Sequence, residues 1–220
     1  MITGIIGDTH IPFEREGYLA FVYNIFRKYK VKRVVHIGDL VDNHAISYHE
    51  HDPDGLSSGP EASAVMKKLD RWKMAFPKLD IIMGNHDKLP ERQAKSSGLS
   101  NRFVKSFREV WELPAAWSVH PHYVEIDGVK YLHGLGASGR NGALNMATSQ
   151  LQSCVVGHSH SFGGVQYQRG GLTVFGMNVG CGVDEDAYAF EYATYFRNRP
   201  TLGCGVVIDG KQAIFIPWEV

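Results

Sequence analysis

The sequence has no long hydrophobic run, and no uncharged apolar stretch approaches the roughly 20 residues that a membrane-spanning helix needs. Residues 1–6 lead directly into an apolar segment, without the basic region and long apolar core of a secretory signal. These absences argue against a membrane or secreted protein and favour a cytoplasmic one that makes no contact with a membrane.

An excess of charge of either sign is also missing, because 23 Lys and Arg residues balance 23 Asp and Glu residues. No global field therefore draws the chain to nucleic acid or to an anionic surface, and such attraction would need a local patch. Cysteine is scarce as well: Cys154, Cys181 and Cys204 are odd in number and lack Cys-x-x-Cys spacing. This argues against a cysteine-based metal site and indicates a reducing compartment.

Histidine, in contrast, is abundant. The chain carries 11 histidines in 220 residues, and histidine is the commonest metal ligand. The hydrophobic share of 44% and the charged share of 21% are ordinary for a globular enzyme. No linker or repeat divides the chain, so we expect one domain over residues 1–220.

The first part of the chain alternates between apolar strands and amphipathic helices, which predicts parallel strands joined by right-handed crossovers. From residue 119 onward, pairs of short apolar runs flank turn signals such as Asp127-Gly128, which predicts hairpins. The predicted strands are 2–7, 31–37, 79–83, 123–126, 129–133, 154–156, 165–168, 172–177, 206–208 and 213–216, and the predicted helices are 18–29, 61–76 and 140–150, with helical pieces in 88–113.

A long polar loop at about 43–60 interrupts this alternation and reads as an insertion at the rim of a site. It contains His44, His49 and His51, which we expect to be solvated rather than to bind metal.

Polar motifs follow five of the predicted strands. Carboxyl ends of strands are where ligands bind in open α/β sheets, so these motifs should converge in space although some 150 residues separate the first from the last. They are Asp8-x-His10, Gly38-Asp39-x-x-Asp42, Gly84-Asn85-His86-Asp87, His133-Gly134 and Gly157-His158-x-His160. Carboxylate, imidazole and amide groups together suit manganese, iron, zinc or nickel.

In these motifs and their order, the chain resembles the calcineurin-like binuclear metallophosphoesterases. The resemblance covers residues 8–160 and implies an α/β fold: a four-layer α/β/β/α sandwich of two mixed sheets flanked by helices, with the later hairpins in the second sheet. It also implies two divalent metal ions, with manganese our first expectation and iron, zinc or nickel the alternatives.

The resemblance implies a role for each motif residue. One metal would be held by Asp8, His10, Asp39 and His160, and the other by Asp39 as a bridge with Asn85, His133 and His158. His86 would stand at the phosphate as acid or transition-state stabiliser, and Asp42 would hold His86. Asp87 is expected to support the site without binding metal. A metal-bridging hydroxide would then attack the phosphorus of a phosphoester in line.

One departure bears on the substrate. Protein phosphatases of this superfamily carry Asp-Arg-Gly, and their arginine grips the phosphate, whereas this chain has Asp42-Asn43-His44. We therefore expect a phosphodiesterase acting on a nucleotide, a cyclic nucleotide or a short single-stranded nucleic acid. Six basic residues against one acid in 88–108, interleaved with Phe103 and Phe107, are compatible with such a substrate. The candidates for phosphate contact are Arg140, Lys88 and Arg92.

Two other classes of function remain open: a phosphomonoesterase acting on nucleotides or proteins, and a non-catalytic metal-binding scaffold or regulator. The complete set of ligand positions argues against a scaffold. The pair His86 and Asp42 argues against a regulator, because neither residue is needed merely to hold metal.

Overall fold

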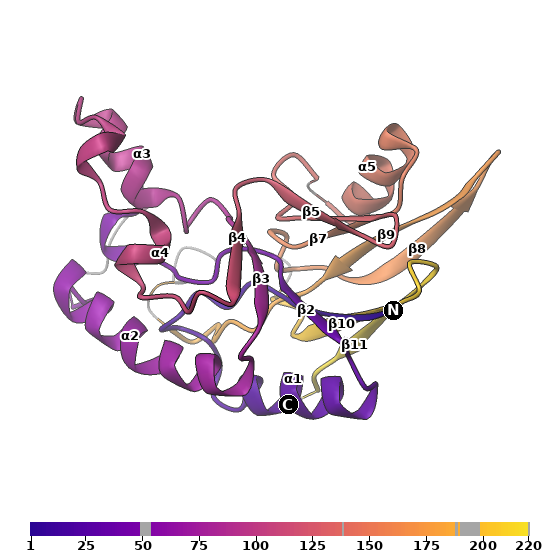
Figure 1. The fold of residues 1–220 in the computed structure, drawn as a ribbon, viewed down its shortest axis with the longest axis horizontal. Coiled ribbons are helices and arrows are strands. Elements are labelled where there is room, and N and C mark those ends of the chain that lie inside the picture. The colour runs from indigo at the N-terminus through magenta and orange to yellow at the C-terminus, as the bar shows by residue number, and fades with distance from the viewer. Residues whose placement is uncertain (49–53, 138, 188, 190–198, 220) are drawn as a thin grey trace.

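Two mixed β-sheets lie face to face, with helices on their outer sides (Figure 1). The structure is a computed structural model that describes residues 1–48, 54–137, 139–187, 189 and 199–219. It confirms the expected four-layer architecture of α/β/β/α. None of the helices within these ranges is long and apolar enough to cross a bilayer.

The six-stranded sheet has the order β11-β10-β1-β2-β3-β4. Its strands β1 to β4 are parallel, while β10 and β11 run antiparallel beside β1. The strands are β1 (Ile2–Ile6), β2 (Arg33–His36), β3 (Leu79–Ile82), β4 (Trp117–His120), β10 (Gly203–Ile208) and β11 (Gln212–Pro217).

The five-stranded sheet has the order β5-β6-β7-β9-β8. Strands β6, β7 and β9 are parallel, and the edge strands β5 and β8 are antiparallel to their neighbours. The strands are β5 (Tyr123–Ile126), β6 (Val129–Leu132), β7 (Cys154–Val156), β8 (Gly163–Arg169) and β9 (Thr173–Val179).

Helices α1 and α2 cover the outer face of the six-stranded sheet, and α5 covers that of the five-stranded sheet (Figure 1). Helices α3 and α4 stand at one end of the molecule. The helices are α1 (Tyr18–Lys28), α2 (Ser58–Ala75), α3 (Leu89–Ser96), α4 (Phe107–Val110) and α5 (Gly142–Gln150), with short 3₁₀ turns η1 (His44–Ile46) and η2 (Asn101–Phe103).

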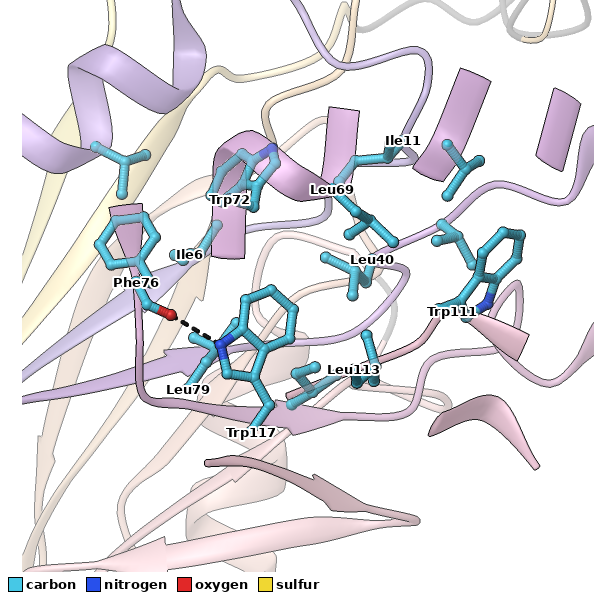
Figure 2. Close-up of a cluster of buried hydrophobic side chains, with 14 of the residues drawn as sticks. Ile6, Ile11, Leu40, Leu69, Trp72, Phe76, Leu79, Trp111, Leu113 and Trp117 are labelled. Atoms are coloured by element: carbon cyan, nitrogen blue, oxygen red, sulfur yellow. Dashed lines mark hydrogen bonds between the residues drawn. The ribbon is translucent and has the colours of Figure 1, made fainter. Parts of the chain in front are cut away.

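The six-stranded sheet is buried on both faces. Neighbouring residues of β1 divide between them: Ile5 packs in the layer between the sheets, and Ile6 packs under the helices. This explains why the strands read as continuous apolar runs rather than alternating ones. Under the helices, Trp117 is fully buried and its indole nitrogen donates to the carbonyl of Phe76 at 2.7 Å (Figure 2).

The structure corrects three expectations. The hairpin β10–β11 joins the six-stranded sheet rather than the second one, because β10 pairs with β1. Strand β4 follows helix α4 and pairs with β3, where no strand was predicted. Helix α2 begins at Ser58, so the polar loop is shorter than the predicted 43–60 and contains η1; its residues 49–53 lie outside the described residues.

The three cysteines are buried and form no disulfide. Burial raises the pKa of the Cys154 thiol to about 11. They therefore act as small apolar side chains of the core.

Candidate metal centre

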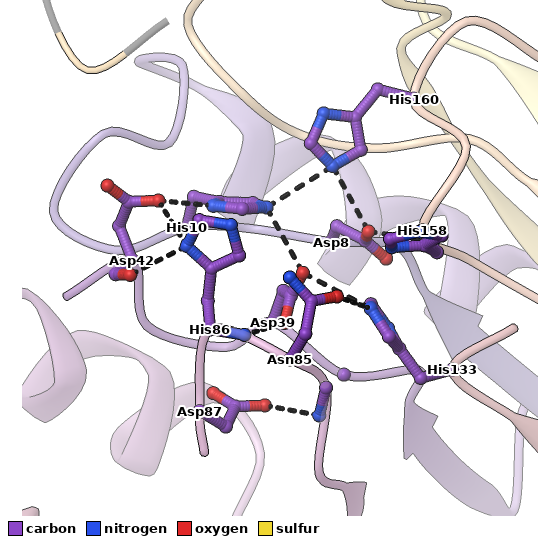
Figure 3. Close-up of polar contacts among 12 residues, drawn as sticks. Asp8, His10, Asp39, Asp42, Asn85, His86, Asp87, His133, His158 and His160 are labelled. Carbon is purple, nitrogen blue, oxygen red and sulfur yellow. Dashed lines mark hydrogen bonds and ion pairs between the residues drawn. The ribbon is translucent and has the colours of Figure 1, made fainter. Parts of the chain in front are cut away.

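The five polar motifs meet at the carboxyl ends of five strands (Figure 3). The loops after β1, β2 and β3 come from the six-stranded sheet, and those after β6 and β7 come from the five-stranded sheet. The site therefore lies where the edges of two facing sheets adjoin, and not on one sheet alone.

A first group of donor atoms comes from Asp8, His10 and His160. The Nε2 atom of His160 lies 3.1 Å from Asp8 Oδ2 and 3.2 Å from His10 Nε2. One donor atom from each residue lies within 4.8 Å of the others, a spacing at which all three could hold one metal ion.

A second group comes from Asp39, Asn85, His133 and His158. The Nε2 atom of His133 lies 3.0 Å from Asn85 Oδ1 and 3.2 Å from Asp39 Oδ2. His158 stands beside His133 with ring centroids 5.0 Å apart, and the donor atoms of His158, His133 and Asp39 lie within 4.8 Å of one another. This group could hold a second ion.

Asp39 lies between the two groups, and its two oxygens have different partners. Its Oδ1 accepts the backbone N–H of His86 at 2.8 Å. Its Oδ2 lies 3.2 Å from His133 Nε2 in the second group and 3.6 Å from His10 Nε2 in the first. Oδ2 is therefore the atom that faces both groups.

Asp42 holds two histidines rather than the one expected. Its Oδ1 lies 2.5 Å from His10 Nδ1 and 3.1 Å from His86 Nδ1. Facing a carboxylate, His10 Nδ1 carries the proton, and the lone pair of His10 Nε2 is left for a cation. This is the carboxylate–histidine arrangement that supports metal ligands in other proteins.

The tautomer of His86 is fixed in the same way. Its Nδ1 also lies 2.8 Å from the backbone carbonyl of Asp42, which can only accept, so Nδ1 must carry a proton. Burial lowers the pKa of His86, but the hydrogen bond with Asp42 and the charges of Asp39 and Asp42 outweigh it and raise the pKa to about 10. His86 can therefore be an imidazolium at neutral pH, with Nε2–H available to donate. One donor atom of His86 also lies within 4.8 Å of His10 and Asp39, so geometry alone would allow it to approach a metal.

The buried carboxylates are held in their charged form. Burial raises the pKa of Asp8 and Asp39, but neighbouring imidazole groups outweigh it, and both pKa values lie below the usual range. These groups are His133 and His160 for Asp8, and His133, His86 and His10 for Asp39. Burial likewise lowers the pKa of His133, but the charges of Asp39 and Asp8 raise it to about 9. A proton on the imidazole of His133 thus offsets the negative charge of Asp8 and Asp39, as a bound cation would.

The donor set fits a pair of divalent cations. The Oδ1 atom of Asp8 is buried and has no hydrogen-bond partner among the described residues. A buried carboxylate oxygen without a partner costs free energy, and a cation bound to this oxygen would offset that cost. Mixed oxygen and imidazole donors suit the borderline metals.

Three of the site residues have a strained backbone. His10, Asp39 and His158 have φ values of 48°, 49° and 66°, in the left-handed region that side chains other than glycine rarely adopt. Such strain persists only where surrounding contacts fix it, and it collects at functional sites. Here it occurs in the loops that follow β1, β2 and β7.

The structure reveals supporting residues that were not predicted from the sequence. His36 ends β2 and is fully buried; Gly38 N–H donates to its Nδ1 at 3.3 Å, and Nε2 lies 3.0 Å from Thr9 Oγ1. Burial lowers the pKa of His36 to about 3, so it stays neutral and joins the first two loops. A polar residue inside the apolar run 34–37 was the signal. Glu61 is a second supporting residue, and no signal in the sequence indicated it. Its carboxylate accepts the backbone N–H groups of His44 and Ala45 at 2.8 Å.

Asp87 supports the site through the backbone. It accepts the N–H groups of Gly84 at 2.8 Å and of Val41 at 3.2 Å, which ties the loops after β3 and β2 together.

The histidines of the polar loop differ from expectation in one case. His44 is buried beside Asp42, not solvated, because Glu61 draws its backbone inward. His49 and His51 lie outside the described residues.

The predicted phosphate contacts divide between two places: Lys88 and Arg92 are neighbours at the start of α3, and Arg140 lies in the loop before α5. Lys88 Nζ donates to the carbonyl of Pro121 at 2.7 Å, and the Arg92 guanidinium lies 4.9 Å from the centre of the Tyr48 ring. Arg140 is exposed in the loop before α5 and lines a cleft that begins next to His160.

The basic segment 88–108 offers less to a nucleic acid than its sequence indicated. Phe107 is buried in the core, whereas Phe103 is 74% exposed. Arg108 donates to the backbone carbonyls of Leu113, Pro114 and Trp117, so its charge is used within the fold. Phe103 alone of the two rings is available for stacking.

Comparison with known proteins places the chain in a family. A sequence model of the calcineurin-like phosphoesterases matches residues 1–162. No curated protein sequence matches the chain.

Solved structures with similar folds include an archaeal phosphodiesterase, with 20% identity, a TM-score of 0.49, and coverage of 99% of this chain and 100% of that one. They also include the phosphoesterase YfcE of E. coli, with 17% identity, a TM-score of 0.45, and coverage of 94% and 88%. Vps29 of Chaetomium thermophilum has 14% identity, a TM-score of 0.49, and coverage of 100% and 97%. On the family match, which spans more than half of its length, the chain belongs to the calcineurin-like phosphoesterases.

Proposed function

We propose that this protein is a two-metal phosphodiesterase that hydrolyses a nucleotide, a cyclic nucleotide or a short single-stranded nucleic acid. The observation that carries the proposal is the position of Asp39 Oδ2 between two groups of donor atoms. Asp8, His10 and His160 would hold one ion with Asp39, and Asn85, His133 and His158 would hold the other. Manganese is the first candidate for both ions, and residues 1–220 would act as one domain.

Bound in these two groups, divalent ions would lower the pKa of a water between them and neutralise phosphoryl oxygens. His86 would donate from Nε2 to the leaving oxygen, because Asp42 holds its Nδ1 and favours the imidazolium. Asp42 would also keep the Nε2 of His10 turned towards the first ion.

Asn43 supports a diester rather than a phosphomonoester substrate. In this chain the side chain of Asn43 donates to the carbonyl of His86 at 3.0 Å, and so holds the catalytic loop. Asn43 stands where the protein phosphatases of the superfamily carry an arginine, whose bidentate grip would suit the dianionic end of a monoester.

The test compares hydrolysis of bis(p-nitrophenyl) phosphate and p-nitrophenyl phosphate at a series of manganese concentrations. We expect faster cleavage of the diester. The His86→Ala variant should lose roughly 100-fold or more in kcat, in the range of general acid catalysis. Its bound manganese, measured by elemental analysis, should match the wild type.

Three results would contradict parts of the proposal. Preference for the monoester would move the assignment to a phosphomonoesterase. Absence of cleavage with manganese, iron, zinc and nickel would favour a metal-binding scaffold or regulator. Full diester turnover in His86→Ala would remove His86 from its role as acid.

A further inference from the structure

A cleft of about 720 Å³ adjoins the candidate metal centre without including its ligands. Ser161, the residue after His160, begins one wall, and strand β8 continues it. Thr201 forms part of another wall and donates its backbone N–H to the carbonyl of His160 at 2.7 Å. The volume lies in the range of small-molecule sites.

The charged residues lining this cleft are two arginines. Arg140 enters from the loop before α5, and its side chain has no partner among the residues described. Arg199 enters from the segment before β10, is 69% exposed, and lies 3.5 Å from Glu185 Oε2. Two guanidinium groups facing one space favour an anion, and their planar fork suits phosphate.

Asn178 on β9 provides a second, independent indication of a ligand. It lines the cleft and is 5% exposed, yet its Oδ1 has no hydrogen-bond partner among the described residues. A buried acceptor without a donor costs free energy unless something supplies one. A sugar hydroxyl or a base amino group would supply it.

The register of the sheet places this acceptor close to the metal-binding loop. Asn178 pairs with Val156 on β7, and the next residues after Val156 are Gly157 and His158. On its other side Asn178 pairs with Gly164 of β8. The cleft is therefore continuous with the loop that carries two proposed metal ligands.

We infer that this cleft binds a phosphorylated nucleoside unit next to the scissile bond, so that the preferred substrate carries a second phosphate beyond the one hydrolysed. Arg140 and Arg199 bind that second phosphate, and Asn178 accepts a hydrogen bond from the sugar or base attached to it. The inference rests on the proposed phosphodiesterase function and specifies its substrate.

The test compares kcat/KM for the thymidine dinucleotide with one internal diester and for its 5′- and 3′-phosphorylated forms. For the wild type, kcat/KM of one phosphorylated form should exceed that of the unphosphorylated dinucleotide by roughly tenfold or more. This factor corresponds to the free energy of a charge-assisted hydrogen bond. Arg140→Gln and Arg199→Gln should reduce this preference, chiefly through KM. The matched control is Arg169→Gln, an exposed arginine at the far end of β8, which should keep the wild-type preference.

A wild type without preference, or a preference untouched in both cleft variants, would overturn the inference. Bis(p-nitrophenyl) phosphate distinguishes failure of this inference from failure of the proposed function, because it is a diester that lacks a second phosphate. If the wild type does not cleave it, the proposed function itself is wrong. Binding of thymidine 3′,5′-bisphosphate, measured by calorimetry, tests the cleft without turnover. Weaker binding in Arg140→Gln and Arg199→Gln than in Arg169→Gln supports the inference, and equal binding in all three contradicts it.

Discussion

Single carboxylates do more than one task in this site. Asp42 orients His10 and His86 through one oxygen atom, and Asp39 divides its two oxygens between a backbone N–H and the donor groups. Both side chains are almost fully buried, so water could not take over their contacts with the histidines unless the histidines moved.

The Asp42→Asn variant tests the residue that holds both histidines. An amide carries no charge to favour the imidazolium, so the pKa of His86 should fall. A general acid acts below its own pKa, and the alkaline limb of the pH–rate profile should therefore move to lower pH. Metal affinity should also fall by roughly 10–100-fold, as for other residues that support metal ligands.

Elemental analysis and the pH profile of diester hydrolysis measure the two effects of Asp42→Asn. An unchanged alkaline limb would show that Asp42 does not set the protonation of His86.

At the level of elements, the loops after β2 and β3 are in close contact. Gly84 faces Asp39, and a Cβ atom on Gly84 would lie 2.5 Å from the backbone nitrogen of Asp39 and 2.7 Å from its Cγ. Both distances are too short for a real contact, so the loops approach this closely only because residue 84 is a glycine.

Gly84→Ala should therefore displace Asp39 and reduce diester hydrolysis by roughly 100-fold, the cost of a small misplacement in an active site. Gly59→Ala is the matched control: Gly59 has open space around it, in the first turn of α2, and should keep full activity. Equal activity of the two variants would contradict the tight contact between the loops.

A second contact between elements joins β2, β3 and β4 without involving the proposed metal ligands. Asp80 lies 2.8 Å from Arg33 Nε and 2.7 Å from His120 Nε2. Burial raises the pKa of Asp80, but its hydrogen bonds with Arg33 and His120 outweigh this and lower the pKa. Since the folded pKa is lower than the unfolded one, the stabilisation is present above about pH 4 and is lost as the pH falls through the folded pKa.

We expect Asp80→Asn to reduce the free energy of unfolding at pH 7 by about 1 kcal/mol, with partly exposed Arg33 limiting the effect. Urea denaturation should show the difference from wild type shrinking below about pH 4. Asp70→Asn, which removes an exposed ion pair with Lys73, is the control and should change stability by less than about 0.5 kcal/mol. A difference for Asp80→Asn that is independent of pH would contradict the assignment.

At the scale of the whole molecule, much of the architecture could be predicted from the sequence. The spacing of apolar residues located most strands, and the polar residues that follow the strands identified the site. Both signals are local, because the residues that form one strand and its loop are adjacent in the sequence. Strand β4 escaped because Trp117–His120 mixes apolar and polar residues and is not a continuous apolar run. The position of β10–β11 also escaped, since β1 and β10 are distant in sequence and local pattern does not specify long-range pairing.

The details of the site show the same limit. The bond between Asp42 and His10 depends on the left-handed backbone at His10, which no pattern of residue types indicates. The cap that Glu61 provides for the polar loop depends on where α2 packs. Such contacts between distant segments are properties of the assembled fold.

The proposed function rests on one claim: five loops from two sheets form a single centre that needs two metal ions to cleave a diester. The most direct measurement is a titration of metal-free protein with manganese, in which bound metal and hydrolysis of bis(p-nitrophenyl) phosphate are followed together. We expect turnover to appear as the second equivalent binds, and Asp39→Asn to bind metal poorly and show no turnover. Full turnover with one equivalent bound, or two equivalents bound in Asp39→Asn, would contradict the claim.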